Sequence, residues 1–125
     1  MINTNTVLGF LNDETKQIID ARSLERFLGT SPEPRAEIRS GHIPSSKSLP
    51  YSSLLNKTEL KPVKELQELF LNLNPKNKAF IFSCGSGITA CVLALGATVA
   101  GVENLSVYDG SWSEWGSLSH LPIEI

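Results

Sequence analysis

Three short apolar runs, each of a length typical of a buried strand, alternate along the chain with segments of helical pattern. The predicted strands are residues 17–22, 79–83 and 105–108. This alternation favours an α/β domain in which helices cover a mainly parallel sheet. Open α/β sheets bind ligands at the edge where the carboxyl ends of their strands meet. We therefore expect the residues at these strand ends, among them Asp20, Cys84 and Asp109, to share that edge.

The helical segments differ in how much of their surface is apolar. Residues 62–73 show the clearest amphipathic pattern, with a proline in a first-turn position. Residues 88–100 are apolar on most sides, as expected for a helix packed on a sheet. Two shorter helices are predicted at residues 6–11 and 23–28, the second ended by Gly29.

Residues 30–53 have no regular pattern and contain Pro32, Pro34, Pro44 and Pro50. These prolines disfavour both helix and central strand. Because a loop of this length in a small domain usually has a function or serves as a lid, we interpret the segment in that way.

The 125 residues are enough for one compact domain, and the charge balance disfavours some partners. With 11 basic and 13 acidic residues the formal net charge is -2, which argues against nucleic-acid binding. No apolar run reaches the roughly 20 residues that span a bilayer, and residues 1–6 show no secretion signal. We therefore expect a cytoplasmic protein that binds neither nucleic acid nor a membrane.

The chain has two cysteines, Cys84 and Cys91, and two histidines. One cysteine pair cannot build a disulfide scaffold, and the spacing offers no structural zinc site. Cys91 lies within the apolar helical segment, where core packing is the expected role.

Cys84 follows a predicted strand and precedes a glycine-rich loop and a helix. Gly85 and Gly87 would let successive N–H groups turn toward the sulfur, and the positive end of the helix would add to their effect. Both contributions favour the thiolate, the nucleophilic form of cysteine. Ser86 and Thr89 would add hydroxyl donors. The alternative is that Cys84 is simply a small buried apolar residue.

The residues after Cys84 argue against other known nucleophile motifs. A tyrosine-phosphatase-like loop needs arginine where this chain has Ala90, and a thioredoxin-like motif needs a second cysteine where it has Gly87. The residues around Ser86 also do not match the G-x-S-x-G turn of serine hydrolases.

Five segments resemble, in order, those of the rhodanese superfamily. They are IDAR at residues 19–22, RFLGTSPEPR at 26–35, GHIP at 41–44, CGSGITA at 84–90 and YDGSWSEW at 108–115. The loop that contains Cys84 is most similar to that of the 3-mercaptopyruvate sulfurtransferase branch. The resemblance covers residues 17–122 and implies a rhodanese-like α/β fold, with a mainly parallel sheet of about five strands flanked by helices. It also implies that residues 1–125 are one rhodanese domain, similar to the C-terminal, cysteine-bearing domain of two-domain members.

By the same resemblance, the expected activity is sulfur transfer through a persulfide on Cys84. The donor would be 3-mercaptopyruvate or thiosulfate, and the acceptor cyanide or a thiol such as that of thioredoxin. Members that use thiosulfate carry basic residues after the cysteine, so the neutral Gly85 and Ser86 favour mercaptopyruvate. Ser86 takes the place of a serine that relays a proton in the family. No metal or other cofactor is implied.

The resemblance also assigns substrate-binding residues. Arg26 and Arg35 occupy positions that hold the substrate in the family, and a guanidinium binds a carboxylate well. The loop residues assigned to substrate binding are Gly85, Gly87, Ile88 and Thr89.

Other residues of these segments are expected to support the site rather than to react. Asp20 and Arg22 are interpreted as structural and His42 as a framework residue, while Arg39 stays open between structure and binding. Trp112 and Trp115 fit the core and the pocket lining equally well.

A second hypothesis is a catalytically weak sulfur-carrier or interaction module that docks on a partner or on an N-terminal rhodanese domain. Its support is the single domain and the apolar tail at residues 118–125. If it is right, an apolar face should be exposed.

Overall fold

A four-stranded parallel sheet forms the centre of the molecule. The computed structural model describes residues 1–85 and 88–125, the side chain of residue 88 excepted. The strand order is β2-β1-β5-β6. The bounds of these strands are Lys16–Asp20 for β1, Lys47–Ser48 for β2, Ala79–Ser83 for β5 and Leu105–Val107 for β6. Asp20 pairs with Ser83, and Phe82 with Val107, so the carboxyl ends of the three long strands lie at one edge.

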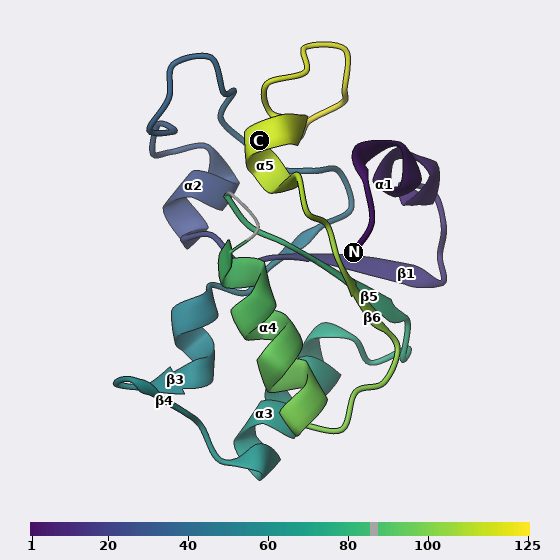
Figure 1. Cartoon of the computed structure of the whole chain (residues 1–125), viewed down its shortest axis with the longest axis vertical. Helices are drawn as coiled ribbons and strands as arrows, with labels where there is room; N and C mark the ends of the chain where they lie inside the picture. The colour runs from purple at the N-terminus through teal and green to yellow at the C-terminus, as the bar shows by residue number, and fades with distance from the viewer. Residues whose placement is uncertain (86–87) are drawn as a thin grey trace.

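Helices lie on both faces of this sheet (Figure 1). The face with α3 and α4 also carries a 3₁₀ helix, η1, and a small antiparallel hairpin. The bounds are Thr4–Phe10 for α1, Leu24–Leu28 for α2, Tyr51–Leu54 for η1, Leu55–Asn56 for β3, Glu59–Leu60 for β4, Val63–Leu73 for α3, Ile88–Val99 for α4 and Ser111–Trp115 for α5. In the described part of the chain, no helix has both the length and the apolar character needed to cross a bilayer.

Two apolar clusters fill the space between the sheet and its helices. Successive side chains of a strand point to opposite faces, so Ile19 and Phe82 pack with Leu66 and Leu93 on the α3–α4 side. On the other side, Ile18 and Ile81 of the sheet pack with Val7, Tyr108, Trp112 and Trp115. The two tryptophans are fully buried, so they belong to the core.

The predicted α/β fold with a parallel sheet and flanking helices is confirmed, and most predicted elements lie within a few residues of the observed ones. The main sheet has four strands, and two further strands form the separate hairpin. Its fourth strand, β2, lies within residues 30–53, which were predicted to be irregular. Its two residues pair with Ile19 and Asp20 of β1. A strand of two residues is too short to show the alternation of apolar and polar residues that predicts a strand.

The C-terminal tail packs on two glycines that have left-handed backbone angles. Gly29 ends α2 with φ +77, as predicted, and Gly41 has φ +123. His42 and Glu124 exchange backbone hydrogen bonds of 2.9 Å each, which fix the tail beside Gly41. A Cβ atom on Gly41 would collide with the carbonyl oxygen of Glu124. The position therefore requires glycine for both its conformation and its close contact.

We predict that Gly41→Ala lowers the free energy of unfolding by about 2 kcal/mol, because an L-residue is strained there and its methyl group meets the tail. Gly9→Ala is the matched control, since an added Cβ in α1 meets nothing within 4 Å. The control should gain about 0.5–1 kcal/mol from helix propensity. Urea unfolding measures both, and equal effects would contradict the prediction.

Candidate active site

Cys84 lies directly after β5 at the carboxyl edge of the sheet, where its main chain is held by α5. Its N–H donates to Ser111 Oγ over 3.0 Å, and its carbonyl accepts from the N–H of Trp112 over 2.8 Å. The carbonyl of Gly85 accepts from the N–H of Ser113, also over 2.8 Å, and from its hydroxyl. The side chain of Cys84 is 1% exposed and packs among residues of the α3–α4 cluster.

Ser111 is a residue that the sequence analysis did not single out. It is fully buried and has φ +52, an unusual angle for a residue other than glycine. Its hydroxyl accepts from the N–H of Cys84, donates to the carbonyl of Tyr108 over 2.8 Å, and lies 3.9 Å from Cys84 Sγ. Ser111 therefore connects the end of β6 to the cysteine. The available sequence signal was its place in the YDGSWSEW segment, shortly after a predicted strand.

Arg26 brings a positive charge to the same edge. Its Nε and Nη2 donate to the two oxygens of Glu33 over 2.9 and 2.7 Å. The hydrogen bond to Glu33 raises the pKa of Arg26 above its usual value, while partial burial opposes the shift, and the charges of Glu33, Asp20 and Cys84 add smaller increases. Arg26 Nη2 lies 3.0 Å from the place that a Cβ atom on Gly85, the neighbour of Cys84, would take.

A pocket of about 300 Å³ opens between Arg26 and the cysteine loop. Its described lining residues are Arg26, Glu33, Pro34, Arg35, Ile38, Gly85 and Ser113. A Cβ atom on Gly85 would lie 3.0 Å from Arg26 Nη2, so a larger residue there would push against the guanidinium. The two arginines predicted to bind substrate therefore share one pocket with Gly85.

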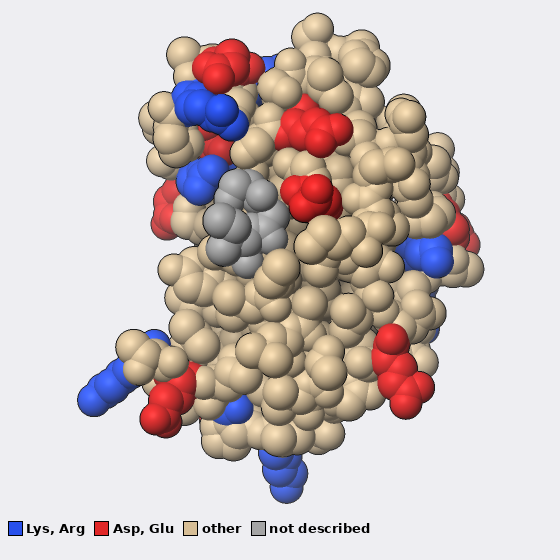
Figure 2. Space-filling view, in the orientation of Figure 1, with Lys and Arg blue, Asp and Glu red and all other residues tan. Residues whose placement is uncertain are grey.

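The two arginines differ in how firmly they are held. Arg35 is 61% exposed, and its Nε is 3.9 Å from Glu37, which is itself exposed. Arg26 is 30% exposed and pairs with a buried carboxylate. The space-filling view shows basic and acidic groups together on the upper part of this face, over α2 and the loop after it (Figure 2). Of the two cations, Arg26 therefore has the shorter ion pair and the smaller exposure.

Part of the predicted site lies outside the described residues. This applies to Ser86, to Gly87 and to the side chain of Ile88. The predicted proton relay through Ser86 and the ring of N–H donors around the sulfur therefore stay predictions. Thr89 is half-buried in the first turn of α4. Among the described residues, no group of three His, Cys, Asp or Glu side chains is arranged to hold a metal.

The predicted supporting residues are structural. Arg22 forms a buried ion pair with Asp20 at 2.7 Å. His42 stacks on Phe27, and its Nδ1 lies 2.7 Å from the Phe27 carbonyl oxygen. Arg39, which the sequence left open, donates from its guanidinium to four carbonyl groups between residues 115 and 121, and so holds the C-terminal segment.

The prediction for Cys91 is wrong, because this side chain is exposed. The first half of α4 turns Ala90 and Leu93 toward the sheet, so Cys91 faces outward with Leu95. An apolar pattern on all sides of a helix does not identify the buried side, and this explains the error.

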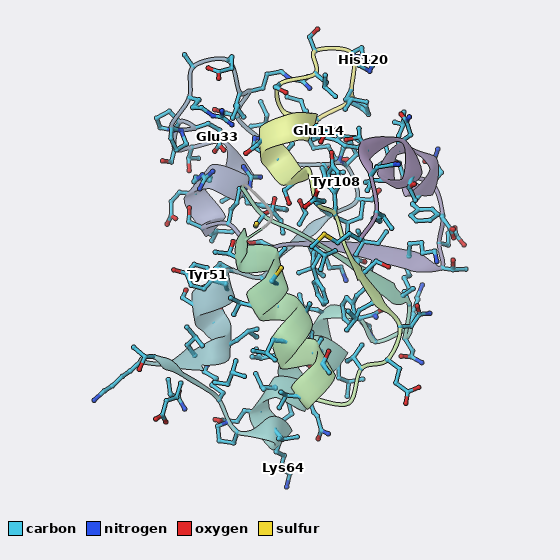
Figure 3. All side chains as sticks on the ribbon, in the orientation of Figure 1. Glu33, Tyr51, Lys64, Tyr108, Glu114 and His120 are labelled. Atoms are coloured by element: carbon cyan, nitrogen blue, oxygen red, sulfur yellow. The ribbon has the colours of Figure 1, made fainter. Side chains whose placement is uncertain are left out.

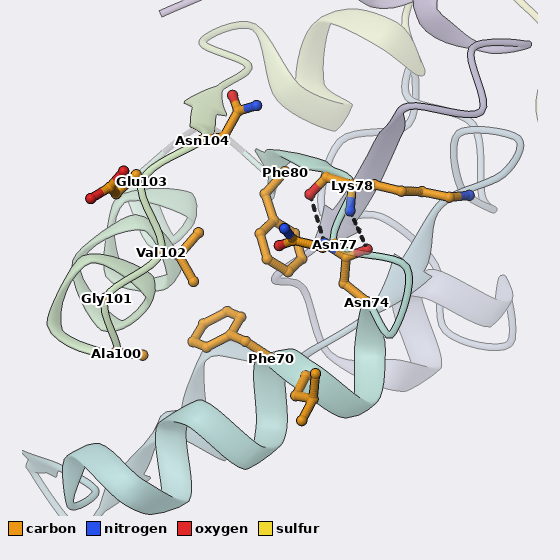
Figure 4. Close-up of a pocket in the computed structure, with 11 residues that line it drawn as sticks. Phe70, Asn74, Asn77, Lys78, Phe80, Ala100, Gly101, Val102, Glu103 and Asn104 are labelled. Carbon is orange, nitrogen blue, oxygen red and sulfur yellow. Dashed lines mark hydrogen bonds between the residues drawn. The ribbon is translucent and has the colours of Figure 1, made fainter.

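A larger cavity, of about 440 Å³, lies at the opposite end of the sheet (Figure 4). Phe70, Phe80 and Val102 face it, while the side chain of Asn74 is occupied by two hydrogen bonds to the main chain of Lys78. No predicted site residue lines this cavity, so the smaller pocket beside Gly85 is the candidate site.

Comparisons show that the chain is similar to a known family of proteins. A profile of the family described as Rhodanese-like domain matches residues 4–118. Thiosulfate/3-mercaptopyruvate sulfurtransferase 1, mitochondrial, from Arabidopsis thaliana is 47% identical over 116 residues, which cover 91% of this chain and 31% of that protein. The 3-mercaptopyruvate sulfurtransferase of Escherichia coli (strain K12) is 41% identical over 125 residues, which cover 99% and 44%.

A solved structure is also similar to this chain. The crystal structure of SseA from Escherichia coli, described with the rhodanese fold and mechanism of 3-mercaptopyruvate sulfotransferases, matches with a TM-score of 0.74 at 38% identity. The match covers 91% of this chain and 42% of that one. The chain thus spans less than half the length of each of these relatives.

We predict that Ser111→Ala lowers the free energy of unfolding by about 2 kcal/mol, because two buried main-chain groups lose their hydrogen-bond partner. Serine and alanine are both unfavourable at this left-handed backbone angle. The difference in unfolding free energy between parent and variant therefore reports the loss of the hydroxyl. Ser117→Ala is the control, since its exposed hydroxyl makes a single bond of 2.8 Å to the Glu114 carbonyl. It should stay within about 0.5 kcal/mol of the parent. A loss no larger than that of the control, in denaturant unfolding, would contradict the role of Ser111.

Proposed function

We propose that this chain, which belongs to the rhodanese-like domain family, is the cysteine-bearing part of a sulfurtransferase that uses 3-mercaptopyruvate. The observation that carries the proposal is the position of Cys84 at the carboxyl edge of the sheet, beside a pocket that presents Arg26 and Arg35. The similarity to proteins named 3-mercaptopyruvate and thiosulfate sulfurtransferases supports the same reaction class. Thiosulfate is the second candidate donor.

The proposed reaction has two steps that balance without a cofactor. The Cys84 thiolate attacks the sulfur of mercaptopyruvate, an S–S bond forms, and the C–S bond breaks with its electron pair left on carbon. The resulting pyruvate enolate takes up a proton, for which Ser86 is the proposed relay. An acceptor thiolate, as in thioredoxin, or cyanide then attacks the outer sulfur and releases the Cys84 thiolate.

Arg26 and Arg35 are proposed to bind the donor's carboxylate. A guanidinium offers donors in a plane that matches a carboxylate, and partial burial strengthens the interaction. The main chain of Gly85, Gly87, Ile88 and Thr89 is proposed to bind the reacting sulfur and the substrate.

An interaction module with weak catalysis is the alternative function. One observation favours it: apolar side chains on α2 and α4 are exposed. The most exposed of them are Leu24 and Leu28 on α2 and Leu95 and Val99 on α4. Turnover by the isolated chain at a rate that does not change when candidate partners are added would argue against this alternative.

We predict that Cys84→Ser reduces pyruvate release from mercaptopyruvate at least about a thousandfold, because the nucleophile is lost. The parent, incubated with donor alone, should gain about 32 Da, the mass of one sulfur, and the variant should not. Cys91→Ser is the matched control, since Cys91 lies on the outer face of α4. Activity that survives in Cys84→Ser, or is lost in Cys91→Ser alone, would contradict the assignment.

We predict that Arg26→Ala raises KM for mercaptopyruvate about 10- to 100-fold, as expected for a lost charge-assisted hydrogen bond. Arg35→Ala should have a smaller effect, because Arg35 is more exposed. Lys64→Ala provides the control, since Lys64 lies at the far end of the molecule (Figure 3). Steady-state kinetics in which KM does not change in either arginine variant would show that these residues do not bind the carboxylate.

A further inference from the structure

Glu33 is a buried carboxylate between two arginines, and neither the sequence analysis nor the proposed reaction gives it a role. Its side chain is 1% exposed. Its Oε2 accepts from Arg26 Nε at 2.9 Å and from Arg22 Nη1 at 3.4 Å, and its Oε1 accepts from Arg26 Nη2 at 2.7 Å. A carboxylate at this depth needs such partners, because an unpaired buried charge is strongly unfavourable.

The Arg22 side of this arrangement is fixed to the body of the fold. Nε and Nη2 of Arg22 donate to the carboxylate of Asp20, and Nη2 also donates to the carbonyl of Gly41 over 2.7 Å. The guanidinium lies 4.7 Å from the ring centre of Trp112. Arg22 therefore cannot turn without breaking several buried contacts, and it provides Glu33 with a rigid anchor.

The Arg26 side faces the pocket. Glu33 takes the Nε and Nη2 edge of the guanidinium, which carries five N–H donors in all. Within the described chain, Glu33 is the only acceptor for these donors, so the Nη1 donors remain available to a ligand. Nη2 is also the atom closest to the position of a Cβ on Gly85. The pairing thus fixes which edge of Arg26 is turned toward a substrate.

We propose that Glu33 is a positioning residue for donor binding: it holds Arg26 in the orientation that receives the carboxylate of the sulfur donor beside Cys84. The inference rests on the proposed function and adds to it a residue that touches neither the sulfur nor the donor. Without Glu33, Arg26 would be a partly exposed arginine with many rotamers, and binding would have to restrict them.

Two effects of removing Glu33 have opposite signs, and this makes the inference testable. Loss of a negative charge beside the pocket would by itself strengthen the attraction for anions. Loss of the fixed Arg26 geometry would weaken the binding of a carboxylate. If Glu33 is a positioning residue, the second effect is the larger.

The experiment measures alkylation of Cys84 by iodoacetate, which carries a carboxylate, relative to iodoacetamide, which is neutral. It is done in a Cys91→Ser background, which leaves Cys84 as the only cysteine. The ratio of the two rates should fall about fivefold in Glu33→Gln, and less in Glu33→Asp, which keeps the charge but moves the carboxylate back by one methylene. Glu65→Gln makes the same charge change at an exposed position of α3, outside the pocket, and should leave the ratio unchanged.

Kinetics with mercaptopyruvate provide the second measurement. Glu33→Gln should raise KM about tenfold while kcat stays within about twofold, because the chemical step on Cys84 is untouched. A purely structural role would instead lower the amount of folded enzyme, and thermal unfolding would show this.

A rate ratio that rises in Glu33→Gln would mean that Glu33 acts as a countercharge only and would overturn the inference. A ratio that stays constant in both Glu33 variants would overturn it as well. If Glu33→Gln does not fold, the charge-conserving Glu33→Asp decides the question. Alkylation requires no sulfur transfer, so its outcome is separate from any failure of the proposed activity.

Discussion

The buried guanidinium of Arg22 is the interaction on which the arrangement of the candidate site depends. It joins four segments that are distant in sequence: the end of β1 through Asp20, the following loop through Glu33, the Gly41 turn, and α5 through Trp112. A buried charge that loses one partner destabilises the protein more than a surface ion pair would. The segments around the cysteine loop are therefore held in place as a group.

This network accounts for the order in the long segment between α2 and β2, which has few backbone ladder bonds. Its anchors are side chains: Glu33 to the two arginines, Arg39 to the carbonyl groups of residues 115–121, and His42 to the Phe27 carbonyl. The tail returns beside Gly41 and closes the arrangement. Glu33, Pro34, Arg35 and Ile38 of this segment line the pocket beside Gly85. A loop of this length in a small domain usually has a function.

Elements with a strong local pattern were predictable, and those defined by distant contacts were not. Strand β5 and helix α3 carry apolar periodicity and were placed within a residue of the observed bounds. Helix α5 was missed because five residues are too few to establish a helical period. Its buried tryptophans, Trp112 and Trp115, pack in one cluster with Val7 of α1 and with the sheet. Cys84 and Arg26 could be placed from the strand end and the motifs. Ser111 and Glu33 could not, since their roles come from partners in other segments.

Two segments, one before and one after Cys84 in the sequence, hold the candidate site by different kinds of interaction. Neutral hydrogen bonds from α5 fix the main chain of Cys84 and Gly85, whereas ion pairs from the segment before β2 fix the charge of Arg26. One contact between the two is that of Arg22 with Trp112, whose main-chain N–H donates to the Cys84 carbonyl. In the proposed reaction, the neutral bonds would position the main chain of the nucleophile, and the charges would position the donor's carboxylate. If the proposed function is right, the rhodanese-like fold of this chain places the nucleophile and the donor-binding charge on different segments.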